Sequence, residues 1–480
     1  MAYPRFMLAA ASSGSGKTLL TCGILQALSD RGLSVASFKC GPDYIDPMFH
    51  SKVIRTTSRN LDTFFTDEET TRYLFTKTAA KADISVMEGV MGYYDGLGGI
   101  SVKASSYDLA SVTDTPVILL VNAKGMSISM LALIKGFLEY QPESRIRGVI
   151  LNQIPEMLYL EMKERIENSL GIHCYGYIPL LKDFKLESRH LGLVLPDEIQ
   201  DLQSNLKKLA QILEKTLELD EILKLAETAG EIYGRIPEFT PVVSRQNSTA
   251  ETRDAVFEDS GNLLYEKPVI AVAKDEAFCF LYEDNLDLLQ QMGAELVYFS
   301  PIHDQQLPKA DGMLLYGGYP ELFAKELYEN EGMRKSVREA VESGMPCMAE
   351  CGGFMYLQQE IEDMSGKKYP GAGAIPGSAY RTERLGRFGY ITLTPQKSQM
   401  LGMDIGEIRG HEFHYFDSTE CGDCFHAQKP LRKKNWSCIH GNENLLAGFP
   451  HLYYYSNPKI AECFLKKCME YKKISTKGLL

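Results

Sequence analysis

A glycine-rich segment near the start of the chain has the residue types needed to bind phosphate groups. Its sequence is Ala11-Ser12-Ser13-Gly14-Ser15-Gly16-Lys17-Thr18. Backbone N–H groups of such a loop, followed by a helix N-terminus, can surround phosphate oxygens. The lysine can reach the terminal phosphates, and the threonine can hold a magnesium ion. We therefore predict that a nucleotide is bound by Gly14, Ser15, Gly16, Lys17 and Thr18, although Ala11 stands where the usual pattern has glycine.

Four carboxylates follow two predicted strands close to this loop. They lie in the segments Gly41-Pro42-Asp43-Tyr44-Ile45-Asp46-Pro47 and Glu88-Gly89-Val90-Met91-Gly92-Tyr93-Tyr94-Asp95-Gly96. A carboxylate that ends a buried strand beside a phosphate loop is suited to bind magnesium. We expect metal binding by Thr18, Asp43 and Glu88, and catalytic orientation of substrate or ammonia by Asp46 and Asp95. For each acidic residue alone, the alternative is a solvated turn.

A cysteine in the second half of the chain stands where a nucleophile would be presented. The segment is Met345-Pro346-Cys347-Met348-Ala349-Glu350-Cys351-Gly352-Gly353-Phe354. An apolar strand ending in Cys351, then two glycines and a helix, is typical of a nucleophile elbow. The start of that helix is expected to lower the pKa of the thiol. The amides of Gly318, in an upstream Gly-Gly turn, and Gly352 are predicted to form an oxyanion hole.

Spacing alone does not identify the base for this nucleophile, because His411, His414 and His451 all lie in suitable segments.

Cys421 and Cys424 form a CxxC pair, with His426, Cys438 and His440 nearby. One CxxC without a matched second pair is weak evidence for structural zinc.

Alternating apolar and helical segments supply the elements that must position these residues. Strands are predicted at residues 5–10, 35–39, 84–88, 117–122 and 147–152, and again at 269–273, 296–299, 312–315 and 346–349. Helical patterns include residues 19–28, 205–227, 284–291 and 321–342. This alternation indicates an α/β fold with two doubly wound sheets, whose ligands gather at the carboxyl ends of the strands. We predict a first domain at 1–236, a linker at 237–266 that is rich in Pro, Ser, Thr and Asn, and a second domain at 267–480.

The composition excludes several classes of function. The 480 residues carry a formal charge of −12 at pH 7, which argues against broad nucleic-acid binding. No apolar run approaches the length of a membrane span, and the eleven cysteines suit free thiols in a cytoplasmic protein. We expect a cytoplasmic protein with no nucleic-acid or membrane partner. The sequence leaves open whether the protein forms a homodimer.

The two acidic segments, and Ser188-Arg189-His190-Leu191-Gly192-Leu193, resemble cobyrinic acid a,c-diamide synthases. The N-terminal part of this family is similar to dethiobiotin synthetase. The segment around Cys351 resembles the class I glutamine amidotransferase domain fused to it. Asn122 is a departure, because many members have aspartate there. Class I amidotransferases usually have Pro-Glu after the catalytic histidine, whereas this chain has Leu452 and Tyr453. The fused subfamily likewise lacks the standard glutamate.

The resemblance implies ATP- and glutamine-dependent amidation of the a and c acetate groups of a corrinoid, in cobalamin biosynthesis. ATP and Mg²⁺ would be the cofactors, and acyl phosphates the intermediates. The resemblance also implies that Cys351 is the nucleophile and His451 the base, and it leaves the residue that orients His451 unidentified. His411 and His414 would then have structural or interdomain roles. Asn152 would contact adenine or act as a cap. We expect substrate contacts from Tyr44, Arg189 and His190, because guanidinium suits carboxylates.

Two alternatives remain at this point. Another tetrapyrrole, such as hydrogenobyrinic acid or nickel-sirohydrochlorin, would present the same polycarboxylate chemistry. A partner-switching P-loop ATPase is the non-enzyme alternative, and the elbow at Cys351 and the acidic pair Asp43 and Asp46 disfavour it.

Overall fold

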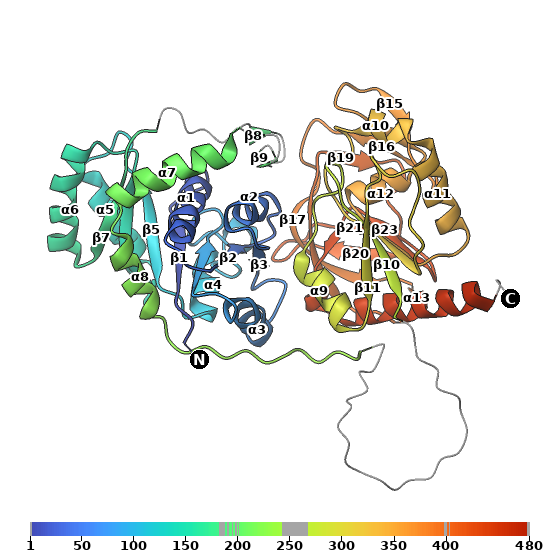
Figure 1. Ribbon diagram of the computed structural model, residues 1–480, viewed down its shortest axis with the longest axis horizontal. Helices are drawn as coiled ribbons and strands as arrows, with labels where there is room; N and C mark the ends of the chain where they lie inside the picture. Colours follow the sequence, from blue (N-terminus) through green and yellow to red (C-terminus); the bar gives the residue numbers. More distant parts are fainter. Residues whose placement is uncertain are drawn as a thin grey trace, which may run out of the picture. The chain divides into compact units, whose positions relative to one another are not determined.

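The computed structural model describes residues 2–181, 188–189, 192–193, 195–196, 199, 201–241, 267–397, 401–402 and 404–477. These form two compact units, one made chiefly of Met1–Pro237 and the other chiefly of Glu238–Lys429 and Lys433–Leu480 (Figure 1). We call them the N-terminal and C-terminal units. Most of the segment predicted as a linker, residues 242–266, lies outside the described residues.

The N-terminal unit is built on a seven-stranded parallel sheet with the order β3-β2-β4-β1-β5-β6-β7. The strands are β1 (Arg5–Ala10), β2 (Val35–Cys40), β3 (Arg59–Leu61), β4 (Ile84–Glu88), β5 (Val117–Asn122), β6 (Ile146–Asn152) and β7 (His173–Ile178). Their apolar residues are almost entirely buried, as expected for a parallel sheet covered on both faces. The order reverses at β1, so the phosphate loop that follows β1 lies at the point where ligands gather in such sheets.

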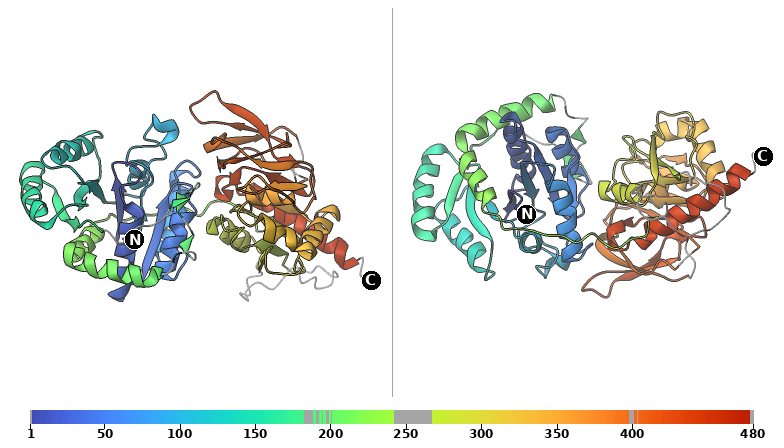
Figure 2. Two further views of the ribbon diagram at one scale, coloured as in Figure 1. Left: turned by 90° about the horizontal axis from the view of Figure 1, so that it is seen from above. Right: turned by 60° about the horizontal axis from the view of Figure 1, so that its bottom comes forward.

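Helices cover both faces of this sheet (Figures 1 and 2). They are α1 (Lys17–Asp30), α2 (Ile45–Ile54), α3 (Glu68–Ala79), α4 (Ser106–Val112), α5 (Ser129–Glu139), α6 (Glu156–Leu170), α7 (Leu202–Thr216) and α8 (Leu219–Glu227). Right-handed crossovers place α1 and α2 on one face and α3 to α6 on the other. The helical pattern at 205–227 is two helices, because Leu217 is extended and bridges to Gly176.

The C-terminal unit has a six-stranded sheet with the order β11-β10-β12-β13-β23-β22, parallel except for β22. Its strands are β10 (Val269–Ala273), β11 (Glu295–Phe299), β12 (Gly312–Leu315), β13 (Cys347–Glu350), β22 (His440–Gly441) and β23 (Leu445–Gly448). Its helices are α9 (Glu283–Gln291), α10 (Ala324–Glu329), α11 (Glu331–Glu342), α12 (Gly352–Leu357) and α13 (Lys459–Lys477). The pattern at 321–342 is divided because the side chain of Asn330 caps α11.

Two further sheets complete the C-terminal unit, and the sequence analysis did not predict them. One has the order β15-β14-β16-β19 and the other β21-β20-β17-β18-β24. The strands are β14 (Glu360–Glu362), β15 (Lys368–Pro370), β16 (Ser378–Arg381), β17 (Phe388–Pro395), β18 (Ile408–Phe413), β19 (Phe416–Ser418), β20 (Phe425–Gln428), β21 (Asn435–Cys438) and β24 (His451–Leu452). Most are short and half-exposed, so their apolar pattern is weak. The second sheet matters for function, because β24 carries His451 and pairs with β18.

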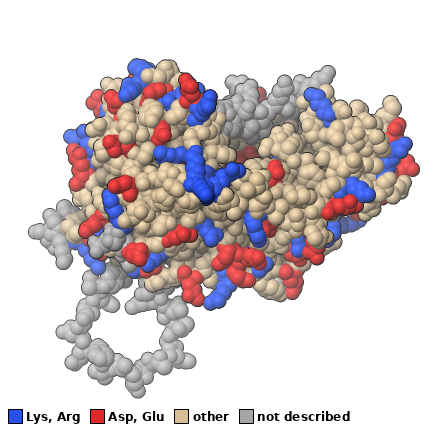
Figure 3. Space-filling view, turned by 180° about the vertical axis from the view of Figure 1, so that it is seen from behind, with Lys and Arg blue, Asp and Glu red and all other residues tan. Residues whose placement is uncertain are grey.

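Among the described residues, no helix is both long and apolar enough to cross a membrane. Acidic and basic side chains are interspersed on the face drawn in Figure 3, without a broad basic expanse.

Candidate functional sites at the phosphate loop and at Cys351

The phosphate loop connects β1 to α1 and depends on glycine at two positions. Gly14 and Gly16 have φ values of 73° and 89°, in the left-handed region that favours glycine. A Cβ on Gly16 would also lie only 2.8 Å from Nδ2 of Asn152. That amide donates to the Ser15 carbonyl at 2.9 Å, so Asn152 ties the end of β6 to the loop.

A cavity of about 320 Å³ lies beside the loop. It is lined by Gly16, Leu19, Leu20, Lys124, Asn152, Gln153, Ile178, Pro179, Leu180, Leu181, Leu209 and Leu213. Apolar side chains dominate this lining, with Asn152, Gln153 and Lys124 as polar groups. A flat heteroaromatic ring needs such a lining, so the cavity is suited to the base of a nucleotide whose phosphates occupy the loop.

Lys17 and Thr18 begin α1 and point toward the carboxyl end of β4. The ammonium of Lys17 donates to the carbonyls of Ser12 (3.2 Å) and Met91 (2.7 Å). Burial, and next the positive charge of Lys39, lower the pKa of Lys17 to about 8. The Thr18 hydroxyl donates to Glu88 Oε1 at 2.9 Å. Two of the three predicted metal ligands, Thr18 and Glu88, are therefore in direct contact.

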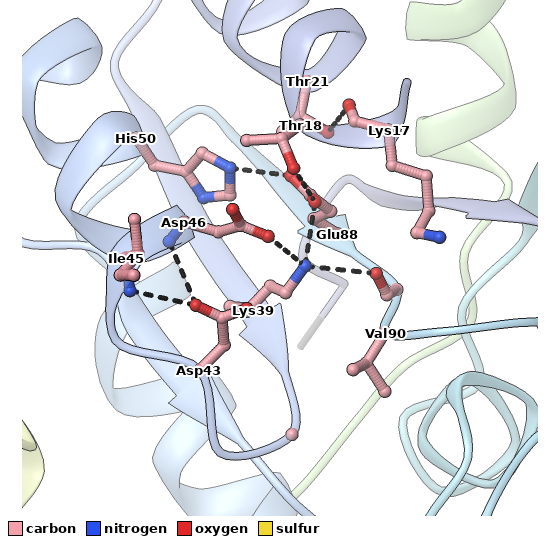
Figure 4. A network of polar contacts seen from close by, with 12 residues as sticks. Lys17, Thr18, Thr21, Lys39, Asp43, Ile45, Asp46, His50, Glu88 and Val90 are labelled. Atoms are coloured by element: carbon pink, nitrogen blue, oxygen red, sulfur yellow. Dashed lines mark hydrogen bonds and ion pairs between the residues drawn. The ribbon is translucent and has the colours of Figure 1, made fainter. Parts of the chain in front are cut away.

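A buried network connects Glu88 to β2 and α2 (Figure 4). Lys39, at the end of β2, donates to Asp46 Oδ2 at 2.5 Å and to Glu88 Oε1 at 2.8 Å. Nε2 of His50 lies 2.8 Å from Glu88 Oε2, and its Nδ1 lies 3.0 Å from the Ser37 hydroxyl. Both oxygens of Glu88 are thus engaged.

Opposite charges determine the ionisation of this network. Burial alone would lower the pKa of Lys39, but Asp46, Glu88 and Asp43 outweigh it and hold the pKa well above the usual value. Burial alone would raise the pKa of Glu88, but Lys39 and His50 hold it well below its usual range. Burial, and then Asp43, raise the pKa of Asp46. Lys39 and Glu88 therefore form a charged pair.

The other predicted residues of this unit make local contacts. Asp43 Oδ1 accepts from the amides of Ile45 (2.9 Å) and Asp46 (3.1 Å) at the start of α2. Asp95 is exposed and accepts from the Gly92 amide at 3.0 Å, while Tyr44 is buried before α2. Their metal, catalytic and substrate roles stay predictions. Arg189 lies in β8 (Ser188–Arg189), which pairs with β9 (Gly192–Leu193); its side chain and all of His190 lie outside the described residues.

The side chains beside the phosphate loop can be compared with the ligands that Mg²⁺ usually has in proteins. No cluster of three His, Cys, Asp or Glu side chains suited to a metal occurs in the described part of the chain. Mg²⁺ in phosphoryl-transfer sites is usually held by one or two protein oxygens together with phosphate oxygens and water. Thr18 and the ionised Glu88 carboxylate fit this pattern.

Cys351 occupies the sharp turn between β13 and α12. Its φ and ψ are 47° and −104°, a conformation that non-glycine residues rarely adopt. Its amide donates to the Gly448 carbonyl at 2.8 Å, which anchors the turn to β23. The side chain is buried, and burial, followed by the charges of Glu321 and Glu412, raises the pKa of the thiol. The expected lowering is therefore wrong: burial outweighs the short helix.

The backbone of the Gly317-Gly318 turn packs closely against the elbow. A Cβ on Gly352 would lie 3.1 Å from the Gly318 amide nitrogen, and one on Gly318 would lie 2.1 Å from the Ala277 carbonyl. The two amides predicted to form an oxyanion hole are therefore adjacent. A side chain at Gly352 would crowd the Gly318 amide, and one at Gly318 would clash with the backbone of Ala277.

His451 is the histidine that lies next to Cys351. A Cβ on Gly317 would lie 2.4 Å from His451 Cε1 and 3.4 Å from Cys351 Cβ, so the two residues meet across this glycine. Burial, and next His414, lower the pKa of His451 to about 3, which keeps the ring neutral near pH 7. Nδ1 of His451 lies 3.8 Å from Glu350 Oε2.

Of the other two histidines, His411 lies in β18 and His414 directly follows that strand. The ring of His411 stacks on His451, with centroids 4.9 Å apart, and its Nδ1 lies 3.3 Å from the Tyr282 hydroxyl. Nε2 of His414 lies 2.9 Å from Glu412 Oε2. Cys421 Sγ lies 3.2 Å from Asp417, and Cys424 Sγ donates to the Gly441 carbonyl, so these thiols do not converge on a metal.

Sequence reasoning missed three residues of these sites: Lys39, His50 and Glu350. Lys39 is the next-to-last residue of β2 and Glu350 is the last of β13, and a charged residue near the end of a buried strand is a recognisable signal. His50 lies four residues after Asp46 on α2, so the two share one helix face.

Two family models match the two halves of the chain. Residues 6–194 match the CobQ/CobB/MinD/ParA nucleotide binding domain, and residues 269–458 match the CobB/CobQ-like glutamine amidotransferase domain. A cobyrinate a,c-diamide synthase of Caldanaerobacter subterraneus is 38% identical over 97% of this chain and 98% of its own length. The chain belongs to the cobyrinate a,c-diamide synthase family. Members from Listeria innocua (40% identity, 95% of this chain and 97% of the relative) and Priestia megaterium (35% identity, 98% and 99%) are similar over almost their full lengths.

Proposed function

We propose that the protein uses ATP and glutamine to amidate the a and c acetate carboxylates of cobyrinic acid, through acyl-phosphate intermediates. The observation that carries the proposal is the presence, in one chain, of the Lys17–Thr18–Glu88 site and the Cys351–His451 pair. Neither site alone makes an amide from a carboxylate and glutamine. Full-length similarity to proteins named cobyrinate a,c-diamide synthase supports the substrate.

The C-terminal unit releases ammonia from glutamine. His451 takes the proton of Cys351, and the sulfur attacks the amide carbonyl carbon while the Gly318 and Gly352 amides stabilise the oxyanion. The carbon–nitrogen bond breaks, and His451 returns the proton to the leaving nitrogen. Water then hydrolyses the thioester, giving glutamate and free Cys351. The ring of His451 is neutral near pH 7, so a nitrogen lone pair is available for this proton.

The N-terminal unit activates the acetate carboxylate. A carboxylate oxygen attacks the terminal phosphorus of ATP, ADP leaves, and an acyl phosphate forms. Lys17 binds the phosphates, the cavity beside Asn152 holds the base, and the carboxylate of Glu88 with Thr18 would hold Mg²⁺. Bound there, Mg²⁺ supplies charge neutralisation on the phosphate oxygens.

Ammonia then attacks the carbonyl carbon of the acyl phosphate. The carbon–oxygen bond to phosphate breaks, inorganic phosphate leaves, and the nitrogen gives up a proton to form the neutral amide. Asp46 and Asp95 are proposed to orient substrate or ammonia in this step, with Tyr44, Arg189 and His190 contacting the corrinoid. The cycle occurs twice, once at each acetate.

Cys351→Ala tests the division of labour. Amidation with glutamine should be lost, whereas amidation with ammonium salts should persist within about twofold, because the acyl phosphate forms in the other unit. Cys463→Ala, which removes a buried thiol from α13, is the matched control and should leave both reactions intact. Loss of the ammonia-dependent reaction in Cys351→Ala would contradict separate sites.

A substrate panel tests the identity of the acceptor. Cobyrinic acid, hydrogenobyrinic acid and nickel-sirohydrochlorin are incubated with enzyme, ATP and glutamine, and the products are followed by mass spectrometry. Two successive amide additions on cobyrinic acid are expected. Faster conversion of either other macrocycle would reassign the substrate.

A further inference from the structure

We propose that Glu350 is the positioning residue that orients His451 for glutamine hydrolysis. Glu350 is the last residue of β13 and directly precedes Cys351, whereas the orienting glutamate of class I enzymes follows the histidine in sequence. This assignment rests on the proposed glutaminase activity of the C-terminal unit. It supplies the third member of a Cys–His–Glu arrangement from a different strand.

The geometry of Glu350 suits this role. Its side chain is 4% exposed, and Oε2 lies 3.8 Å from His451 Nδ1. This is slightly beyond hydrogen-bond length, so a small movement of either side chain would bring the two atoms within hydrogen-bond distance. Oε1 has no hydrogen-bond partner among the described residues, so the carboxyl group has an unused acceptor inside the site.

The fold determines this contact through two strands. β13 lies in the parallel sheet and ends at Glu350, while β24 belongs to the antiparallel sheet and begins at His451. Because the end of β13 lies beside the start of β24, the end of β13 presents both the nucleophile and the carboxyl group that faces the base. Packing of the two sheets therefore replaces the local sequence spacing of a conventional triad.

A neighbouring buried carboxylate is committed to other partners. Glu412 Oε2 pairs with His414 Nε2 at 2.9 Å, and Glu412 Oε1 accepts from Trp436 Nε1 at 3.0 Å. Its oxygens are thus engaged within the sheet. Glu350 accepts a hydrogen bond from the Leu452 backbone, and its carboxyl group also faces the histidine that meets Cys351.

The role of Glu350 is to accept a hydrogen bond from Nδ1–H of His451. This contact selects the ring tautomer in which Nε2 is unprotonated and can take the proton of Cys351. A carboxyl oxygen can accept this bond whether or not the group is ionised. An amide oxygen can therefore substitute in part, and an aliphatic side chain can not.

The test compares Glu350→Leu and Glu350→Gln by steady-state glutaminase kinetics. We expect Glu350→Leu to lower kcat by about 100-fold with KM within about twofold of wild type, and Glu350→Gln to lower it by about tenfold. Asp311→Asn is the matched control. It removes a carboxylate at the amino ends of β10 and β12, whereas Glu350 lies at the carboxyl end of a strand in the same sheet. Ammonia-dependent amidation should be unchanged in all three variants.

If both variants lose kcat equally and KM rises, Glu350 acts through packing alone and the assignment is overturned. If kcat stays within twofold of wild type in both variants, the assignment is also overturned. If Glu350→Leu does not fold, Glu350→Gln decides by the same two parameters. Absence of glutaminase in the wild-type enzyme would overturn the proposed function itself. Wild-type glutaminase with unaffected variants overturns only the role of Glu350.

Discussion

The Lys39–Glu88 pair of the first site and the Cys351, His451 and Glu350 group of the second are buried in opposite states of ionisation. In the N-terminal unit, Lys39 and Glu88 are buried as charges, because each lies within hydrogen-bond distance of an opposite charge. In the C-terminal unit, burial raises the pKa values of Cys351 and Glu350 and lowers that of His451, so each group favours its neutral form.

The difference corresponds to the chemistry that each site must perform. Phosphoryl transfer needs fixed charges in place before the transition state forms, so paired charges are built into the fold. Thiol chemistry needs charge only during the reaction, and a neutral resting thiol is protected from oxidation and from premature hydrolysis of glutamine.

Lys17→Ala should separate the two sites functionally. Amidation with either glutamine or ammonia should fall by about 100- to 1,000-fold, because a preorganised charge at the phosphates is lost. Glutaminase measured without ATP should stay within about twofold of wild type. Lys135→Ala, an exposed lysine on α5, is the control; retention of ammonia-dependent amidation in Lys17→Ala would contradict the assignment.

Lys39→Met should break the charge compensation of the first site. Removing the cation leaves Glu88 and Asp46 buried without it, so the unfolding free energy of the N-terminal unit should fall by about 3–5 kcal/mol. Urea denaturation followed by far-UV circular dichroism measures this loss. Lys135→Met should change stability by less than about 0.5 kcal/mol. A similarly small effect of Lys39→Met would show that the network is not needed for folding.

Acid should destabilise the C-terminal unit through His451. Its pKa is about 3 in the folded protein and 6.5 ordinarily, so between these values the unfolded chain binds a proton that the folded chain does not. Stability should therefore be lost as pH falls from 6.5 toward 3, by a few kcal/mol. His451→Gln should flatten this part of the stability curve measured by thermal denaturation. An unchanged slope would show that His451 does not carry the effect.

The thiol of Cys351 should be slow to alkylate in the resting enzyme. Because burial raises its pKa, the thiolate fraction at pH 7.5 is small, and we expect reaction with iodoacetamide at least about tenfold slower than for an exposed thiol. Peptide mass spectrometry compares the alkylation rate of Cys351 with that of the partly exposed Cys279 of the same chain. Faster alkylation of Cys351 would contradict a neutral resting thiol.

Much of the fold could be predicted from local pattern. The strands at 84–88, 117–122, 269–273 and 312–315 have the predicted bounds, because long apolar runs between turns indicate buried parallel strands. The short strands of the two additional sheets lack such runs. Their formation depends on partners distant in sequence, as in the pairing of β17 with β18 and β20.

The candidate sites were predictable where the chemistry lies in contiguous residues. The phosphate loop and the Cys351 elbow are local turns whose glycines and reactive residues are adjacent in sequence. The contacts of Lys39 and His50 with Glu88, and the raised pKa of Cys351, depend on packing that spacing does not encode.

Residues that are neighbours along the chain encode the two α/β halves, the phosphate loop and the cysteine elbow. The contacts of Lys39 and His50 with Glu88, and of Glu350 with His451, form only when the chain is folded. The ionisation and orientation of a buried side chain depend on the few groups that surround it. Strand order and sheet packing bring those groups together from distant parts of the chain.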